Sequence, residues 1–282
     1  MENQQTKEND LEVLNGIARD LRLDILDMTT KAGSGHPSSS FSAVEILTAI
    51  YFGGILNFNP DDPWWQGRDR FIMSKGHAAP LLYAVLAKAG YFDRQLLWDL
   101  RQVNSPVQGH PIQGMLPGVE ATTGSLGQGL SLGLGHILGG RLNGSTGYRA
   151  YVLLGDGECQ EGQIWEAAMF AAHVKADKLT AIVDYNKYQE SGPISRELAL
   201  EPFADKWRAF GWQVLQIDGH DLPEILEALA TAQATTGKPT VIIARTIKGK
   251  GVSFMEDRLE WHYKSPNKEQ SKQAISELDR SL

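Results

Sequence analysis

Cysteine is nearly absent from this chain, since Cys159 is the only one among 282 residues. A single cysteine cannot form a disulfide within the chain. The N-terminal segment 1–8 also lacks the basic flank and the apolar core of a signal peptide. Both absences predict a protein of the reducing cytoplasm.

Long apolar runs and an excess of basic residues are missing as well. Gly, Asp or Arg interrupts every apolar segment well before the roughly 20 residues that span a bilayer. The 27 Lys and Arg are outnumbered by 34 Asp and Glu, which gives a net charge of −7. No cluster of basic residues offers a surface for a phosphate backbone. The sequence therefore argues against a membrane-spanning protein and against a nucleic-acid partner.

Glycine is abundant, at 29 of 282 residues. The hydrophobic share of 42% and the charged share of 22% are those of a folded protein without low-complexity tracts. The length fits one α/β domain over residues 1–282. Within it, we expect segment 1–10 to be a flexible terminus and segment 265–282 to form a charged helix.

Apolar periodicity predicts the order of the secondary structure. Spacings of three and four predict a helix over 11–30 and another that follows segment 37–42, with an apolar face from Val44 to Tyr51. The predicted strands cover 151–154, 179–183, 213–217 and 240–244, and the helices between them cover 161–174, 201–209 and 222–235. This alternation predicts an α/β fold, a mostly parallel sheet with helices on both faces. Such a sheet binds ligands at the carboxyl ends of its strands.

A carboxylate between two glycines follows the first predicted strand. Gly155-Asp156-Gly157 comes directly after that strand, and Asn186 follows the next one, 30 positions after Asp156. Adjacent parallel strands would bring the two side chains to one edge of the sheet. With a backbone carbonyl they would supply half of an octahedral Mg²⁺ shell, and glycine amides could bind phosphate. Either fragment alone is more simply a turn or a cap, but the spacing of the pair favours a metal–diphosphate site.

Two other nucleotide motifs fail to match. No G-x-x-x-x-G-K-[ST] segment occurs in the sequence. The glycines of segment 124–129 also stand in the wrong order for G-x-G-x-x-G. A P-loop NTPase and a Rossmann dehydrogenase are therefore disfavoured.

The segment from Gly155 to Asn186 resembles the diphosphate half of thiamine-diphosphate enzymes. Four further segments are similar, in order and spacing, to the N-terminal portion of the transketolase family: 32–37, 69–78, 108–111 and 122–129. The resemblance implies the diphosphate-binding domain of the thiamine-diphosphate-binding fold. It also implies the cofactors thiamine diphosphate and Mg²⁺. The implied reaction transfers a two-carbon ketol unit from a ketose phosphate to an aldose phosphate, as in the pentose phosphate pathway.

The same resemblance implies roles for individual residues. The family's metal ligands fall on Asp156, Asn186 and the backbone carbonyl of Tyr188. The implied cofactor-binding residues are His77, Gly124, Leu126, Gly157, Asn186, Lys248 and His262. The implied catalytic residues are His36, His110 and His262. Of these, His36 and His110 match histidines that hydrogen-bond the hydroxyls of the sugar and the developing oxyanion.

For several of these positions a simpler interpretation stays open beside the functional role. Lys248 could instead be a solvated loop residue. Tyr263 follows His262 where the family often has glycine, which alters the backbone expected there. Glu161 matches a family carboxylate near a dimer interface, but it is also an ordinary first-turn helix acid. The three remaining histidines are expected to be structural: His136, His173 and His220.

The family's second domain, which binds the aminopyrimidine ring of the cofactor and carries its activating glutamate, is not present in the sequence. The resemblance thus implies a split enzyme in which this chain pairs with a C-terminal, pyrimidine-binding transketolase subunit in an α2β2 heterotetramer. We expect the Gly129, Ser131 and Gly133 face to contribute to the subunit contact. Two alternatives stay open. One is half of another thiamine-diphosphate enzyme, deoxyxylulose-phosphate synthase-like or 2-oxoacid dehydrogenase α-like, and the other is a non-catalytic cofactor-binding module.

Overall fold

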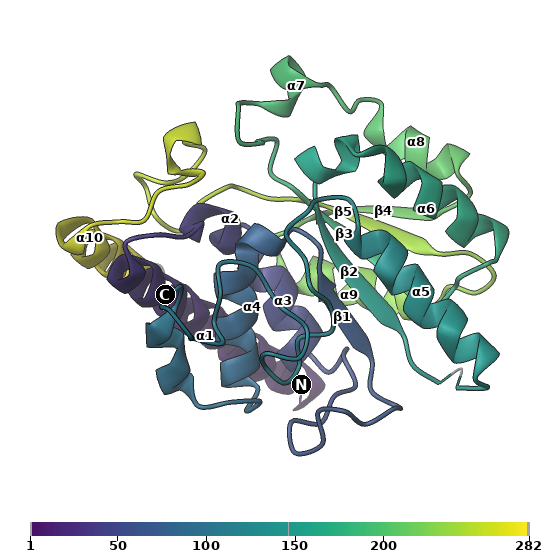
Figure 1. Ribbon diagram of the computed structural model, residues 1–282, viewed down its shortest axis with the longest axis horizontal. Coiled ribbons are helices and arrows are strands. Elements are labelled where there is room, and N and C mark those ends of the chain that lie inside the picture. The colour runs from purple at the N-terminus through teal and green to yellow at the C-terminus, as the bar shows by residue number, and fades with distance from the viewer. Residues whose placement is uncertain (1, 146, 281–282) are drawn as a thin grey trace.

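A five-stranded sheet lies at the centre of the molecule (Figure 1). The computed structural model describes residues 2–145 and 147–280, without the side chains of residues 2–9. The strands are β1 (Arg70–Met73), β2 (Ala150–Gly155), β3 (Leu179–Tyr185), β4 (Gln213–Asp218) and β5 (Thr240–Arg245). Their order in the sheet is β1-β2-β3-β5-β4, and every pairing is parallel.

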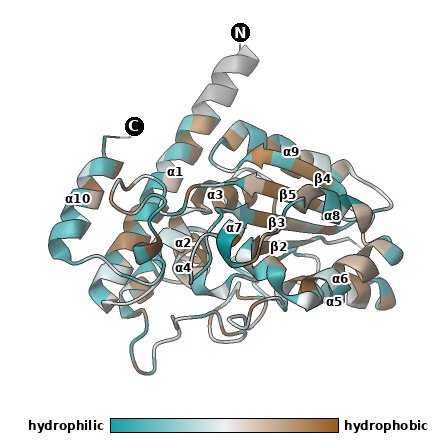
Figure 2. Ribbon diagram, turned by 90° about the horizontal axis from the view of Figure 1, so that it is seen from above, coloured by the Kyte–Doolittle hydropathy of each residue, from teal (hydrophilic) through white to brown (hydrophobic). Residues whose placement is uncertain are grey.

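Helices cover both faces of this sheet. One face carries α1 (Glu2–Ala32), α2 (Pro37–Phe41), α3 (Val44–Phe52), α4 (Ala79–Lys88) and α9 (Leu222–Ala234), and α10 (Lys268–Leu278) packs against α1. The other carries α5 (Gly129–Leu142), α6 (Gly162–His173), α7 (Ile194–Glu197) and α8 (Phe203–Ala209). Short 3₁₀ turns are η1 (Gly76–Ala78), η2 (Arg94–Asp99), η3 (Gly157–Gln160) and η4 (Leu259–Trp261). Figure 2 shows the hydrophobic strands between α9 on one side and α5 and α6 on the other.

The side chains of the strands alternate between two hydrophobic cores. In β1, Phe71 and Met73 belong to the core under α1, α3 and α4, while Ile72 belongs to the core under α5 and α6. Successive residues of a strand point to opposite faces, so a strand buried on both sides is mainly apolar and shows no alternation of apolar and polar residues. The predicted fold class, a mostly parallel sheet with helices on both faces, is confirmed.

Strand β1 is the one strand that the periodicity missed. Its four residues include Arg70, which is buried although it is charged. The guanidinium carbon of Arg70 lies 4.3 Å from the centre of the Tyr148 ring, a favourable cation–π position. A partner that lies far away in the sequence thus makes a charged residue compatible with a buried strand.

The helices agree with their predicted positions, and one further short helix is present. The helix predicted after segment 37–42 is α3, and a break separates it from α2, which was not predicted. At the break, Ser42 donates a hydrogen bond from its hydroxyl to Asp184 Oδ2 at 2.5 Å. The break therefore places a serine-rich turn against the end of β3.

Segment 2–10 belongs to α1 and Met1 lies outside the described residues, so the flexibility expected for 1–10 stays a prediction.

The glycines of α5 face the chain's own sheet. A Cβ atom on Gly129 would lie 2.2 Å from Ser74 Oγ, and one on Gly133 would lie 2.5 Å from Val152 Cγ2. Both glycines therefore let α5 approach β1 and β2 closely. Of the three residues expected at a subunit contact only Ser131 is exposed, so the glycines have a role within this chain, and the contact itself stays a prediction.

The carboxyl ends of the strands converge on one edge of the sheet. There β1 leads into Ser74–His77, β2 into Asp156, β3 into Asn186 and β5 into segment 246–248. Parallel sheets present their ligand sites at this edge. Among the described residues, no helix is long and apolar enough to cross a membrane.

Candidate active site

The residues with implied roles all line one cavity of about 860 Å³ at this edge of the sheet. They are His36, His77, His110, Gly124, Leu126, Asp156, Gly157, Asn186, Tyr188, Lys248 and His262. A larger cavity of about 1210 Å³, between α1 and the segment after β5, contains none of them. The fold therefore gathers the whole set of residues, although they are spread from position 36 to position 262.

Asp156 is a buried carboxylate that links the ends of two strands. Its Oδ1 accepts a hydrogen bond from the Gly157 amide at 2.7 Å, and its Oδ2 accepts one from the Lys187 amide. Burial and the nearby Asp184 carboxylate raise the pKa of Asp156 to about 7. A carboxylate that is costly to ionise in its protein surroundings is stabilised by a bound cation. The environment of Asp156 therefore fits a divalent metal.

Asn186 and Asp184 complete this part of the cavity. Asn186 accepts a hydrogen bond from the Tyr188 amide at its Oδ1 and donates one from its Nδ2 to Asp184, both at 3.1 Å. Asp184 is neutralised by a buried ion pair with Lys75, and it also accepts a hydrogen bond from Thr246. Among the described residues, no lysine or arginine forms such a pair with Asp156. Carboxylate, amide and carbonyl oxygens are hard ligands of the kind that Mg²⁺ prefers.

Three imidazole rings cluster in the lining of the same cavity. The ring centres of His36, His77 and His262 lie 5.2 to 5.9 Å apart. Burial, followed by nearby positive charges, lowers the pKa of His36 and of His262 to about 3 and the pKa of His77 well below its usual value. The rings are therefore neutral at pH 7. The Nδ1 atoms of His36 and His262 are buried and have no hydrogen-bond partner among the described residues, which is unusual for a buried polar atom and points to a functional site.

His110 is held against the glycine-rich segment 122–129. A Cβ atom on Gly124 would lie 3.1 Å from the His110 ring, and Gly124 has a φ of +147°, which favours glycine. The backbone carbonyl of His110 accepts a hydrogen bond from the Tyr83 hydroxyl at 3.1 Å. Burial and the positive charge of Arg101 lower the pKa of His110. This fourth imidazole is also neutral at pH 7.

Two buried lysines meet at Ser39. Lys248 Nζ donates to Ser39 Oγ at 2.6 Å, and Lys75 Nζ donates to the Ser39 carbonyl at 2.8 Å. Each lysine is 1% exposed. Burial, with the charge of Lys75, lowers the pKa of Lys248 to about 7. Lys248 is therefore not a solvated loop residue, and the positive charge at this point favours an anionic ligand.

Sequence reasoning missed several residues of the cavity. Ser39 and Lys75 lie in or beside segments quoted for the resemblance, but nothing local shows that their side chains converge. Tyr263, noted only as a substitution, lies with its ring centre 4.7 Å from that of His36. Its hydroxyl accepts a hydrogen bond from Arg101 Nη1 at 3.1 Å. Half-exposed, Tyr263 covers His36 on the solvent side of the cavity.

Comparisons with known proteins agree with this geometry. The family model described as "Transketolase, thiamine diphosphate binding domain" matches residues 14–278. The 6-deoxy-6-sulfo-D-fructose transketolase subunit SqwG of a Clostridium species is 43% identical over 96% of this chain and 97% of its own length. An apulose-4-phosphate transketolase subunit of Phocaeicola vulgatus is 40% identical over 93% of this chain and 92% of its own length.

Single-chain transketolases match over part of their length. Human transketolase is 40% identical over 95% of this chain, which spans 42% of the human protein. The crystal structure of transketolase from Campylobacter jejuni superposes with a TM-score of 0.89 at 33% identity, over 95% of this chain and 43% of that one. The matched domain binds thiamine diphosphate, which this family uses with a divalent metal. The chain thus belongs to the transketolase family and corresponds to its thiamine-diphosphate-binding N-terminal domain.

Proposed function

We propose that this chain is the N-terminal subunit of a two-polypeptide transketolase, with one diphosphate-binding domain over residues 1–282. The enzyme transfers a two-carbon ketol unit from a ketose phosphate donor to an aldose phosphate acceptor in carbohydrate metabolism. The observation that carries the proposal is the coverage of the relatives. Two proteins named as transketolase subunits align over 97% and 92% of their lengths, whereas human transketolase aligns over 42%.

The metal in this proposal is Mg²⁺, held by Asp156, Asn186 and the backbone carbonyl of Tyr188. The hard oxygen donors and the raised pKa of the buried Asp156 support this assignment. A divalent ion held by these residues would neutralise Asp156 and supply positive charge for the diphosphate.

The diphosphate of the cofactor lies, in this proposal, against His77, Lys248 and the Gly157 amide. The two buried lysines that meet at Ser39 support an anion at this end of the cavity. Gly124 and Leu126 line the same cavity and would lie along the cofactor, with His262 beside it. Bound thiamine diphosphate supplies the nucleophilic carbon that attacks the ketose carbonyl and the electron sink that stabilises the transferred unit.

His36 and His110, with His262, would act on the sugar. A neutral imidazole can donate a proton to a developing alkoxide and accept one from a hydroxyl. The lowered pKa values keep these rings neutral at physiological pH, and the unpartnered Nδ1 atoms of His36 and His262 support contact with a ligand.

The partner in this proposal is a C-terminal transketolase subunit that carries the pyrimidine-binding domain. Two copies of each polypeptide would form an α2β2 heterotetramer, because transketolase sites lie between domains of a two-fold assembly. The names of the two subunit relatives support a separate partner chain. We place the assembly in the cytoplasm, which the single free cysteine supports.

Mixing experiments test this function. The purified chain, candidate C-terminal subunits, Mg²⁺ and thiamine diphosphate are combined, and ketose-to-aldose transfer is followed by coupled assay. We expect transfer only in the mixture, together with a native mass of two copies of each polypeptide. Robust turnover by the isolated chain would refute the split-enzyme proposal.

A further inference from the structure

Two side chains from outside the cavity bond to the main chain of the segment that carries Lys248. Backbone hydrogen bonds from the Gly249 amide to the Ser38 carbonyl and from the Asp257 amide to the Lys248 carbonyl, both at 2.9 Å, also hold this segment. The Ile247 amide donates a hydrogen bond to His220 Nε2 at 2.8 Å. The Lys250 carbonyl accepts one from Arg22 Nε at 3.1 Å. The two anchoring points flank Lys248, whose side chain enters the cavity that binds the cofactor in the proposed function. Besides the backbone bonds, the position of Lys248 therefore depends on two side chains that do not line this cavity.

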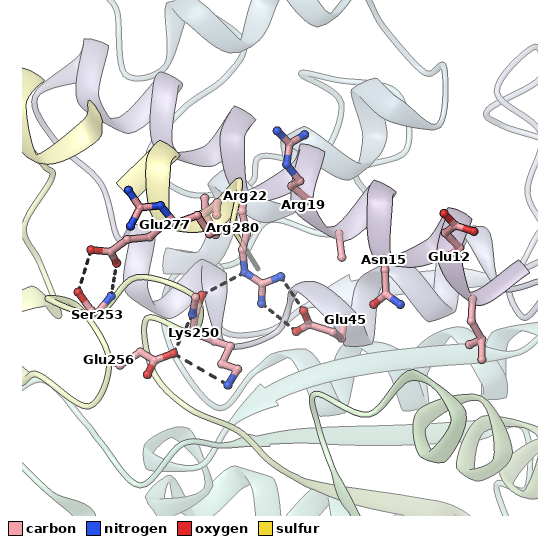
Figure 3. A pocket seen from close by; sticks show the side chains of 14 residues that line it. Glu12, Asn15, Arg19, Arg22, Glu45, Lys250, Ser253, Glu256, Glu277 and Arg280 are labelled. Carbon is pink, nitrogen blue, oxygen red and sulfur yellow. Dashed lines mark hydrogen bonds and ion pairs between the residues drawn. The ribbon is translucent and has the colours of Figure 1, made fainter. Parts of the chain in front are cut away.

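Both anchors converge on one buried carboxylate, Glu45. Arg22 donates from Nη1 to Glu45 Oε1 at 2.6 Å and from Nη2 to Oε2 at 2.9 Å. His220 Nδ1 lies 2.9 Å from the same Oε2. Figure 3 shows Arg22 between Glu45 and the Lys250 segment, with hydrogen bonds to both, in the wall of the 1210 Å³ cavity. The three residues come from α1, α3 and the turn after β4, so three separate elements hold one segment.

The hydrogen bonds also fix the tautomer of His220. A backbone amide can only donate, so the Nε2 atom that faces Ile247 carries no hydrogen. The ring hydrogen is then on Nδ1 and points to Glu45. Burial works against the charge of Glu45, but Arg22 and His220 outweigh it and lower the pKa of Glu45 to about 2. Glu45 thus stays ionised and holds His220 in the tautomer that can accept from Ile247.

We propose that Arg22, Glu45 and His220 are positioning residues that keep Lys248 in the cavity by holding the main chain on both sides of it. The importance of Lys248 to cofactor binding rests on the proposed function. The three residues do not line the 860 Å³ cavity and do not contact the reacting groups themselves. Their effect on the enzyme is therefore transmitted through the segment 247–250.

Chemical labelling of lysines tests the placement of Lys248 without any enzymatic assay. The folded chain is treated with an N-hydroxysuccinimide acetate, and acetylation of Lys248 and Lys75 is followed by mass spectrometry. Lys75 is equally buried and bonds to Ser39, but it follows β1 and is not held by this network, so it serves as an internal control. His220→Ala should accelerate labelling of Lys248 about fivefold, the opening expected from losing roughly one net hydrogen bond, and leave Lys75 unchanged.

Two conservative variants separate positioning from general stability. In His220→Gln the side-chain oxygen can take the place of Nε2 and accept from Ile247, whereas in His220→Asn it is too short to reach. Labelling of Lys248 should therefore return to within about twofold of wild type in His220→Gln and stay fast in His220→Asn. Ser253→Ala, an exposed change three residues beyond Lys250, should label like wild type. Unchanged labelling of Lys248 in His220→Ala, or equal acceleration at Lys75, would overturn the proposal.

The functional consequence is tested in the complex with the partner subunit. His220→Ala should weaken binding of thiamine diphosphate, and this effect should vanish when Lys248→Met is already present, because both changes remove the same contact. An undiminished effect of His220→Ala in the Lys248→Met background would show that His220 does not act through Lys248. Absence of ketol transfer by the wild-type complex would count against the proposed function instead, and the labelling result would still decide where the network holds Lys248.

Discussion

Asp156, at the end of β2, accepts a hydrogen bond from the backbone amide of Lys187, the residue that follows Asn186 at the end of β3. The β2–β3 register places Gly155 beside Asp184, so the two strand ends are level. The carboxylate is therefore oriented by the turn that carries Asn186. A metal would find these two proposed ligands already held in place, and little reorganisation would be needed to bind it.

Removing the proposed metal ligand should abolish cofactor binding but not folding. In the assembled enzyme, Asp156→Ala should weaken thiamine diphosphate binding by at least about 100-fold, because even residues that only orient metal ligands contribute about 10- to 100-fold. The cofactor-free variant should melt at or above the temperature of wild type, since it lacks a buried carboxylate without a cation. Calorimetric titration and thermal melting provide the two measurements. Wild-type affinity in Asp156→Ala would remove this residue from the metal site.

Two histidines of the cavity should have different kinetic effects. His77→Ala should mainly raise the dissociation constant of thiamine diphosphate. His110→Ala should lower kcat/KM for the donor ketose by about 10²- to 10³-fold with cofactor saturating, which is typical for loss of an oxyanion contact. Steady-state kinetics at several cofactor concentrations separate the two effects. Donor kinetics within about threefold of wild type in His110→Ala would contradict its proposed role.

Acid should destabilise the fold through the buried histidines. Above the unfolded pKa of about 6.5, His36 and His262 are neutral in both states and add no pH dependence. As pH falls from there toward about 3, their lowered pKa in the folded state, the unfolded chain takes up protons that the folded chain does not, so stability decreases. Melting temperatures between pH 7 and pH 5 should fall less steeply in His36→Gln than in wild type. A parallel fall in both proteins would argue against burial of a neutral His36.

The ends of β2 and β3 show which part of the site can be predicted from the sequence alone. The pattern after β2 and β3 placed Asp156 and Asn186 at one edge, because parallel strands joined by one helix have a fixed geometry. The histidines of the site and Lys248 were indicated by the resemblance to the transketolase family and not by the strand pattern. The structure brings all of these residues to one cavity.

Interactions between distant segments could not be predicted. Strand β1 was missed because Arg70 is stabilised by Tyr148, and the meeting of Lys75 and Lys248 at Ser39 joins three segments far apart in the sequence. His220, expected to be only structural, bonds to the segment of Lys248 because β4 and β5 are neighbours. Local periodicity does not record which loops pack together, so contacts of this kind need the folded chain.

The tyrosine that covers His36 should influence the substrate more than the cofactor. Tyr263→Gly would open the solvent side of the cavity and remove the hydrogen bond from Arg101. We expect a change of several-fold in KM for the donor, unchanged affinity for thiamine diphosphate and a stability within about 0.5 kcal/mol of wild type, since the side chain is largely exposed. Tyr263→Phe separates the loss of the hydroxyl from the loss of the ring. Identical KM values in all three proteins would show that Tyr263 does not contact the path of the sugar.

A methyl group at Gly124 should disturb catalysis through its contact with His110. Gly124→Ala places a Cβ atom 3.1 Å from the His110 ring and forces an L-residue to a φ of +147°. Backbone strain of this kind costs about 1 to 3 kcal/mol, and relief of the contact would shift His110. We therefore expect lower stability together with a fall in kcat/KM for the donor. Gly135→Ala, in α5 with ordinary φ and open space around its Cβ, is the matched control and should be neutral or stabilising by up to about 1 kcal/mol. If Gly124→Ala lost stability but kept wild-type donor kinetics, the contact between segment 122–129 and His110 would have no part in positioning that ring.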